Sequence, residues 1–215
     1  MAKICTKGCG IVKTKADAVE VNITVSGINF DYDKALSEAA EFLNEVKACL
    51  KKAGFEENSL KTAHFDVSKR TEQIQNEEGI YKNKFIGYEC RYDNILRFPL
   101  DMQRLSDTIS LLSKCSAFPS FDVRFTFEDT VKIKKKLLRA AFEDAKSSAE
   151  ALAEAAGGKL SKLLSIDYSA NVINIYSDTS CNMPAGRMLF KAEAIDITPE
   201  DIENTESVVA EWEMG

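Results

Sequence analysis

Hydrophobic and polar residues alternate along several segments of the chain, the pattern of half-buried β-strands. Residues 17–27 show it most simply, with apolar side chains at Val19, Val21, Ile23 and Val25. Residues 3–13 predict a second strand, and residues 14–17 predict the turn of a hairpin between them. Gly8 and Gly10 share one face of the earlier strand. A helix packed over that face is the favoured interpretation, and close approach of another group to the backbone is the alternative.

Three other segments carry apolar residues three or four positions apart, as amphipathic helices do. The first helix is expected to start at an N-cap of Asp31 or Asp33 and to stop at Gly54. A short second helix is expected around residues 102–112, and a long third helix from residue 129 to residue 156. The third helix should lie close against a sheet, because its predicted buried stripe is mostly alanine: Leu138, Ala141, Ala145, Ala149, Leu152 and Ala156.

Further strands are predicted at residues 59–70, 81–98, 121–128, 162–170 and 207–214. Residues 71–79 are polar and are expected to form the tip of a projecting β-hairpin, whereas residues 171–191 lack periodicity and are expected to be a loop. The element order is then β-β-α-β-β-α-β-α-β-β. This order predicts an α+β fold in which an antiparallel β-sheet packs against helices, within a single domain spanning residues 1–215.

Composition narrows the class of protein. The chain has 215 residues, 45% of them hydrophobic and 29% charged, which is typical of a soluble globular protein. The net charge of −6 argues against non-specific binding to nucleic acid or to an anionic membrane. No apolar stretch approaches the roughly 18 residues of a membrane span, and residues 1–15 show no secretory signal. We therefore expect a cytoplasmic protein, or a periplasmic or exported one if a signal has been removed.

The six cysteines are scattered over predicted strands and helices and form no CxxC pair. Cys5 and Cys9 lie on one predicted strand, where four residues separate them by about 13 Å, too far for both to bind one zinc ion. The favoured interpretation is that all six are reduced thiols, and we expect neither a metal ion nor a cofactor.

The search for catalytic residues begins with His64, the single histidine. It could act as a base toward a cysteine thiol, but no cysteine lies in a recognisable nucleophile signature. The sequence contains no P-loop, GxGxxG, GxSxG or HExxH motif. Tyr88, Tyr92 and Phe98 form an aromatic stripe that could stack bases, although core packing suits an acidic chain better. We expect no catalytic residues and a protein that is not an enzyme.

One surface is a candidate interaction patch. Five cations gather in the first turns of the long third helix: Lys132, Lys134, Lys135, Lys136 and Arg139. Cations are unfavourable at this end of a helix dipole, so a docking site for an acidic partner would explain their presence. The alternative is a solvated helix face without a function of its own.

The sequence resembles the SIMPL-domain family over nearly its whole length. The similarity rests on five stretches, which are GCGIVKTKADAVEVNITV, GYECRYDNILRF, VRFTFED, AFEDAKSSAEALAEAAGGKLSKLLSID and ESVVAEWEM. Ala16 stands where the family usually has proline, and Ser161 where it usually has glycine. The resemblance implies a bacterial member of a family that is linked in animals to protein–protein association and has no established catalytic residues.

Two functions from different classes follow from these observations. The favoured one is a non-catalytic protein-interaction or assembly protein with an unknown protein partner. The alternative is an enzyme whose site is assembled from dispersed carboxylates, His64 or a cysteine thiol.

The long strands at residues 59–70 and 81–98 would leave unpaired backbone edges, and a hairpin that projects alone is only marginally stable. We therefore expect the chain to form a homo-oligomer. The alternative is a monomer whose strand edges are protected by the charged hairpin tip, with Glu72, Glu77, Glu78, Lys82 and Lys84.

Overall fold

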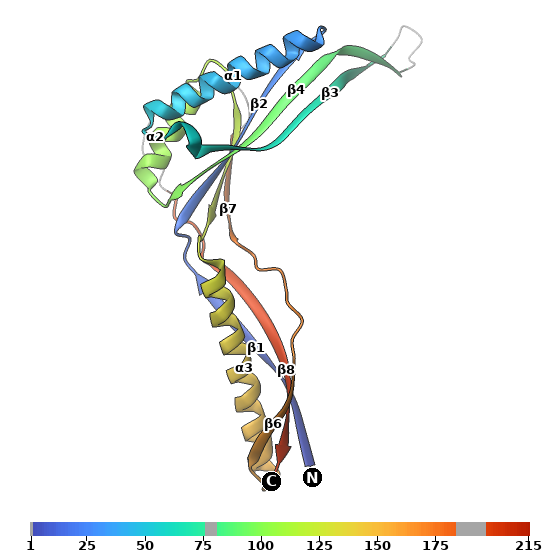
Figure 1. Cartoon of the computed structure of the whole chain (residues 1–215), viewed down its shortest axis with the longest axis vertical. Helices are drawn as coiled ribbons and strands as arrows, with labels where there is room; N and C mark the ends of the chain where they lie inside the picture. Colours follow the sequence, from blue (N-terminus) through green and yellow to red (C-terminus); the bar gives the residue numbers. More distant parts are fainter. Residues whose placement is uncertain (1, 76–80, 184–196) are drawn as a thin grey trace. The chain divides into compact units, whose positions relative to one another are not determined.

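The structure, a computed structural model, describes residues 2–75, 81–183 and 197–215 (Figure 1). The chain divides into two compact units whose residues interleave along the sequence. The first unit consists of residues 1–17, 126–178 and 199–215, and the second of residues 18–125 and 179–198. Both units contain helices and antiparallel strands, which confirms the predicted α+β fold. The expectation of a single SIMPL-like domain over the whole chain stays a prediction.

The second unit is built on a five-stranded sheet with the order β3-β4-β2-β5-β7. Its strands are β2 Ala18–Asn29, β3 Leu60–Gln75, β4 Tyr81–Pro99, β5 Ser120–Thr126 and β7 Tyr176–Met183. Helix α1, Tyr32–Lys52, packs on β2 and β4, and helix α2, Met102–Ser113, packs against α1. A short 3₁₀ helix, Glu57–Ser59, precedes β3. Because it is the first strand in this order, β3 is an edge of the sheet.

Local sequence signals set where α1 begins, ends and packs. The Asp31 carboxylate accepts a hydrogen bond from the backbone N–H of Asp33, so Asp31 is the N-cap, one of the two predicted candidates. Gly54 follows the helix with a φ of +80°, a conformation that glycine adopts without steric cost. At Gly27 of β2, an added Cβ atom would lie 2.9 Å from the Ala39 nitrogen. The helix backbone therefore lies directly on this strand.

The first unit combines a three-stranded sheet, in the order β1-β8-β6, with one long helix. These elements are β1 Ala2–Thr14, α3 Thr130–Ala155, β6 Leu160–Asp167 and β8 Ile202–Met214. The closest approach is at two glycines. An added Cβ atom would lie 2.1 Å from the Ala141 carbonyl oxygen at Gly8, and 2.3 Å from the Leu137 oxygen at Gly10. This confirms the interpretation that a helix packs over the glycine face of β1.

The buried stripe of α3 follows a different path from the one predicted. The buried residues recur every four positions: Ile133, Leu137, Ala141, Ala145, Ala149 and Ala153. Leu138 and Ala156 are not among them, and Leu152 is 53% exposed. A spacing of four exceeds the 3.6 residues of one helical turn, so the line of contact winds around the helix. A winding contact is expected where a helix lies on a twisted sheet.

The prediction that residues 3–13 and 17–27 form a hairpin is wrong. Both strands exist, but β1 pairs antiparallel with β8, and β2 pairs antiparallel with β4 in a different sheet. The connection between them is held by residues far along the chain. The Asp17 N–H donates to the Thr126 carbonyl oxygen, and the Asp17 carboxylate accepts from the Glu128 N–H, both at 3.0 Å. Alternation predicts a strand but does not identify the strand it pairs with.

Strand β7 corrects the expectation that residues 171–191 form a loop. Residues 176–183 join the sheet beside β5, although their sequence, YSDTSCNM, has no alternating apolar positions. The Ser177 hydroxyl donates to the Glu200 carbonyl oxygen at 2.7 Å and holds the start of the strand. Residues 184–191 of the expected loop and residues 76–79 of the expected hairpin tip lie outside the described residues. With β7 added, the element order is the predicted one.

Candidate functional site

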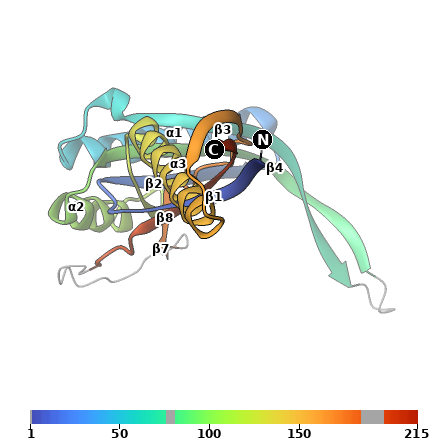
Figure 2. The same cartoon turned by 90° about the horizontal axis from the view of Figure 1, so that it is seen from below.

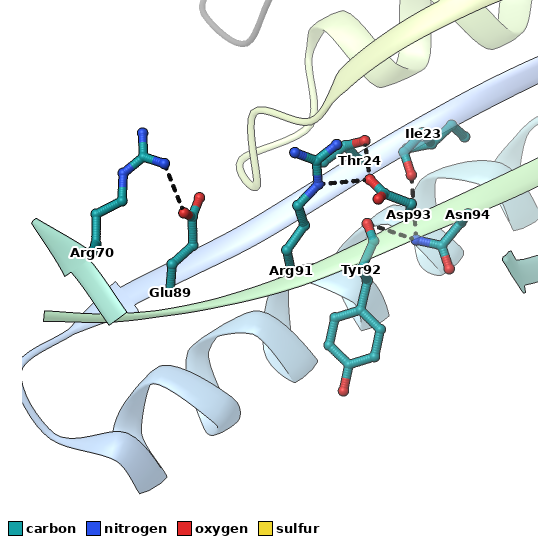
Figure 3. Close-up of polar contacts among 8 residues, drawn as sticks. All are labelled: Ile23, Thr24, Arg70, Glu89, Arg91, Tyr92, Asp93 and Asn94. Carbon is teal, nitrogen blue, oxygen red and sulfur yellow. Dashed lines mark hydrogen bonds and ion pairs between the residues drawn. The ribbon is translucent and has the colours of Figure 1, made fainter. Parts of the chain in front are cut away.

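The sheet of the second unit has one apolar face and one charged face. On β3 and β4, alternate side chains point toward α1, as Val67 and Cys90 do where they pack with Ala39. The intervening side chains point to the opposite face. Figure 3 shows polar contacts of this second group, which includes Arg70, Glu89, Arg91 and Asp93. This charged face is the first candidate site.

Asp93 on β4 accepts two hydrogen bonds through one carboxylate oxygen. The donors are the Thr24 hydroxyl at 2.6 Å and the Arg91 Nε at 2.9 Å (Figure 3). Partial burial acts to raise the pKa of Asp93, but the hydrogen bonds from Thr24 and Arg91 and the charges of Arg91 and His64 together lower it below its usual value. The carboxylate is therefore held in its ionised form by its neighbours.

Other carboxylates on the charged face are bound in the same way. Glu20 on β2 is 2% exposed, and one of its oxygens accepts from the Arg97 Nε at 2.6 Å. Glu89 accepts from the Arg70 Nη1 at 3.1 Å (Figure 3). The arrangement is a ladder of arginine–carboxylate pairs, in which each carboxylate is neutralised by an arginine.

His64 lies on β3, directly opposite Asp93 in the strand register, and its side chain is exposed. Cys90, on the neighbouring strand, is fully buried on the α1 face, where burial and the Asp66 charge raise the pKa of its thiol. Imidazole and thiol thus lie on opposite faces of the sheet and do not meet as base and nucleophile. All six cysteines are free thiols. Within the described ranges, no three or more His, Cys, Asp or Glu side chains gather into a metal-binding group.

An exposed aromatic cluster lies where β2 ends and α1 begins. Phe30 contacts Phe85 with ring centroids 6.1 Å apart, Phe85 contacts Tyr88 at 5.3 Å, and Tyr32 contacts Tyr88 at 5.5 Å. Three of these residues are exposed, at 69% for Phe30, 48% for Tyr32 and 39% for Phe85. We call these four residues the aromatic cluster. Contiguous exposed apolar side chains of this kind mark interaction surfaces.

The hydrophobic pattern of the sequence does not reveal this cluster, because Phe30, Tyr32 and Phe85 belong to no predicted apolar stripe. Tyr88 and Tyr92 are predicted to pack in the core, and both do pack against buried residues of α1 and β4. A usable signal was present in residues 30–33, FDYD, where two aromatic residues alternate with the acidic candidates for the N-cap.

Strands β3 and β4 continue beyond the end of β2 as a two-stranded ribbon. The pairing of β2 with β4 ends at Asn29 opposite Tyr88, whereas β3 pairs with β4 as far as Gln75 opposite Tyr81. Figures 1 and 2 show the ribbon running on past the end of β2. The predicted projecting hairpin is therefore present, and the aromatic cluster lies at its base.

The predicted cationic patch lies in the first unit, on α3. Four of its five members share one exposed face of the helix and line an open depression of about 560 Å³: Lys132, Lys135, Lys136 and Arg139. Lys134 is half-buried and does not line this depression. Arg139 also reaches Glu143 at 3.8 Å, and both side chains are largely exposed. The structure thus brings four of the five residues together, and their role in docking stays a prediction.

No helix in the described part of the chain is both long and apolar enough to cross a membrane.

The model of the SIMPL family, "Protein of unknown function (DUF541)", matches residues 4–212. None of the curated proteins matches the chain.

Similarity to solved structures is low. A phage SAM lyase in complex with S-methyl-5'-thioadenosine gives a TM-score of 0.27 at 13% identity, over 54% of this chain and 85% of the lyase chain. A hydrolase from Listeria innocua gives a TM-score of 0.20 at 10% identity, over 96% of this chain and 92% of the hydrolase chain. At such TM-scores neither similarity bears on the function of this chain.

Proposed function

The chain belongs to the SIMPL family, and from this premise we propose that it is a non-catalytic protein-interaction or assembly protein. The observation that carries the proposal is the aromatic cluster, whose rings are exposed at the base of the ribbon. Aromatic residues are enriched at protein interfaces, because each one buries a large apolar area. The parts of Phe30, Tyr32 and Phe85 that remain in water do not stabilise a monomer, whereas a partner that covers them gains their burial.

The ribbon supports the same proposal. Residues 81–87 of β4 pair with β3 but lie beyond the reach of β2, so this part of the hairpin lacks the third strand that would stabilise it. Its backbone edges and its exposed side chains, among them Ile74 and Tyr81, are available to another protein. A homo-oligomer or a complex with a different protein would cover them.

An enzyme that uses His64 and Asp93 is the second candidate, and the observation in its favour is that the two residues face each other across β3 and β4. It is the weaker candidate for two reasons. Asp93 is engaged by Thr24 and Arg91, and His64 is exposed on an edge strand, where water is not excluded from a reaction.

The proposal extends to compartment and partners. We place the protein in the cytoplasm, with its thiols reduced and with no nucleic-acid partner, in keeping with its net charge of −6. The cationic face of α3 is a proposed docking site for an acidic protein segment, separate in sequence from the aromatic cluster.

Affinity capture tests the proposal. Two differently tagged copies of the chain are co-expressed in the native host, and the captured proteins are identified by mass spectrometry. The double variant F30S/F85S removes two exposed rings, and the control I11S removes an exposed apolar side chain of β1, Ile11. We expect all three to capture a second copy, and the wild type and I11S to capture in addition another protein that F30S/F85S loses. Capture of no protein by the wild type would contradict the proposal, and capture of the same proteins by all three would exclude the aromatic cluster as a contact surface.

A further inference from the structure

Strand β3 is an edge strand, and in the described sheet its neighbour is β4. Edge strands carry unpaired backbone N–H and C=O groups, which proteins usually shorten, interrupt or cover. This edge runs for 16 residues without a proline. Strand β3 has one extra residue, Ala63, near its start, and β4 has one, Ile86, opposite the step from Arg70 to Thr71. From His64 onward β3 itself has no insertion, so it presents a long edge for pairing.

We propose that β3 pairs antiparallel with β3 of a second copy, about a two-fold axis at Ser68. The two five-stranded sheets then join into one continuous sheet, with α1 on the same side in both copies. This inference rests on the proposed assembly function and names its partner, which is a second copy of the chain. The order of charges along β3 determines both the partner and the register.

The charges of β3 are self-complementary about Ser68. In an antiparallel pair centred there, Asp66 of each copy lies opposite Arg70 of the other, and His64 lies opposite Glu72. These side chains are exposed, and they alternate with Val67, which points toward α1, so they share the charged face. Side chains directly opposite each other on antiparallel strands are about 4.5–5.5 Å apart, close enough for ion pairs and hydrogen bonds.

Strand β4 continues this complementarity across the sheet. Within one copy, Asp93 lies opposite His64, and Lys84 lies opposite Glu72. One row of side chains across the joined sheet therefore runs Asp93, His64, then Glu72 and Lys84 of the second copy. In this row the His64 imidazole lies between two carboxylates. Arg91 lies opposite Asp66 in the same way, so the next row reads Arg91, Asp66 and then Arg70 of the second copy. Each row alternates donors with carboxylates.

Neighbouring registers lack this complementarity. Moving the axis one residue earlier than Ser68 sets Arg70 opposite His64, and moving it one residue later sets Asp66 opposite Glu72. Like charges directly opposite each other are destabilising in a sheet, and two donors cannot satisfy each other. The axis at Ser68 instead places a small, uncharged side chain at the point where the two copies come closest.

A disulfide cross-link tests the register. In S68C the two introduced thiols face each other across the axis, at a separation suited to a disulfide. In the control Q73C they are ten residues apart along the paired strands, about 33 Å. Both variants also carry Cys5→Ser and Cys9→Ser, because these two native thiols are exposed. After mild oxidation with diamide, we expect S68C to run as a covalent dimer linked at position 68 and Q73C to stay uncross-linked. Equal cross-linking of the two, or none in S68C, would overturn the pairing.

A charge variant tests the complementarity. R70E and E89Q both break the ion pair between Arg70 and Glu89 within one copy, but R70E alone also sets a glutamate against Asp66 of the second copy. By sedimentation velocity, we expect R70E to raise the dimer dissociation constant on the order of tenfold and E89Q to leave it nearly unchanged. Equal effects of the two variants would overturn the proposed contact. If the wild type is an oligomer but both tests fail, the assembly function holds and uses another surface. If affinity capture fails, the assembly function itself is contradicted.

Discussion

Small side chains set the distance between α3 and β1. Ala145 is fully buried, and its carbonyl oxygen accepts a hydrogen bond from the Thr6 hydroxyl of β1 at 2.7 Å. At Gly8, an added Cβ atom would lie 2.3 Å from the Ala145 nitrogen. The helix and the strand are in backbone contact here, so neither has room for a larger side chain.

Replacing Ala145 by leucine is therefore expected to overpack this contact. We expect Ala145→Leu to lower the free energy of unfolding by roughly 1–3 kcal/mol, because β1 cannot move away without breaking its pairing with β8. The matched control is Ala151→Leu, an exposed alanine on the same helix, which should change stability little. Urea unfolding of both variants tests this prediction. Equal urea midpoints for the two variants would contradict the close packing of α3 on β1.

The side chain of Asp93 gives a second prediction for a single residue, which concerns how the stability of the fold depends on pH. Its pKa is lower in the folded chain than the value of 3.8 for a free aspartate, so its carboxylate stabilises the fold above that pH, and the contribution is lost as the pH falls through the folded-state pKa. Asp93→Asn removes the charge at constant shape. We expect the variant to be less stable by roughly 1–2 kcal/mol near neutral pH, with the difference shrinking at acid pH. Urea unfolding over a pH series measures this, and a difference independent of pH would argue against the assigned ion pair.

Among the elements, those with local signals were predictable from the sequence. The start and stop of α1 follow from Asp31 and Gly54, and the packing of a helix on β1 follows from Gly8 and Gly10, although these glycines do not identify the helix as α3. These features depend on residues close together in the chain, or on the space that a glycine leaves. The same reasoning failed for strand partners, because the pairing of β1 with β8 depends on contacts about 200 residues apart in sequence.

The candidate surface was predictable only in part. Strand β7 is polar, and its place in the sheet depends on contacts such as that between Ser177 and Glu200, which carry no periodic pattern. The aromatic cluster is assembled from the end of β2, the start of α1 and a position on β4. Four members of the cationic patch lie on one helix face, as residues three and four apart do, and their role in docking stays a prediction.

Hydrogen exchange gives a prediction for β3 as an element. If its edge pairs with a second copy, the backbone amides of residues 64–72 that point away from β4 become hydrogen-bonded on assembly and exchange more slowly. We expect peptides covering this segment to be more protected at high protein concentration than at low concentration. Peptides covering β5, which is flanked by β2 and β7, should not change. Protection of residues 64–72 that does not depend on concentration would exclude this edge as the contact.

For the whole molecule, the surfaces of the two units suggest different tasks. The second unit carries the edge of β3, the ribbon and the aromatic cluster, which together favour contact with another folded chain. The first unit carries the cationic face of α3, which suits an acidic segment. The charged face of the sheet consists of arginine–carboxylate pairs, which keep such a surface compatible with water while the edge remains available for pairing.

Assembly is the central claim, and molar mass measures it most directly. Light scattering of the wild-type chain after size exclusion, over a wide range of loading concentrations, gives the mass without reference to shape. We predict a species of about twice the chain mass of 23.9 kDa at high concentration, which shifts toward the monomer on dilution and in R70E but not in E89Q. A single species at 23.9 kDa over the whole range would contradict self-assembly.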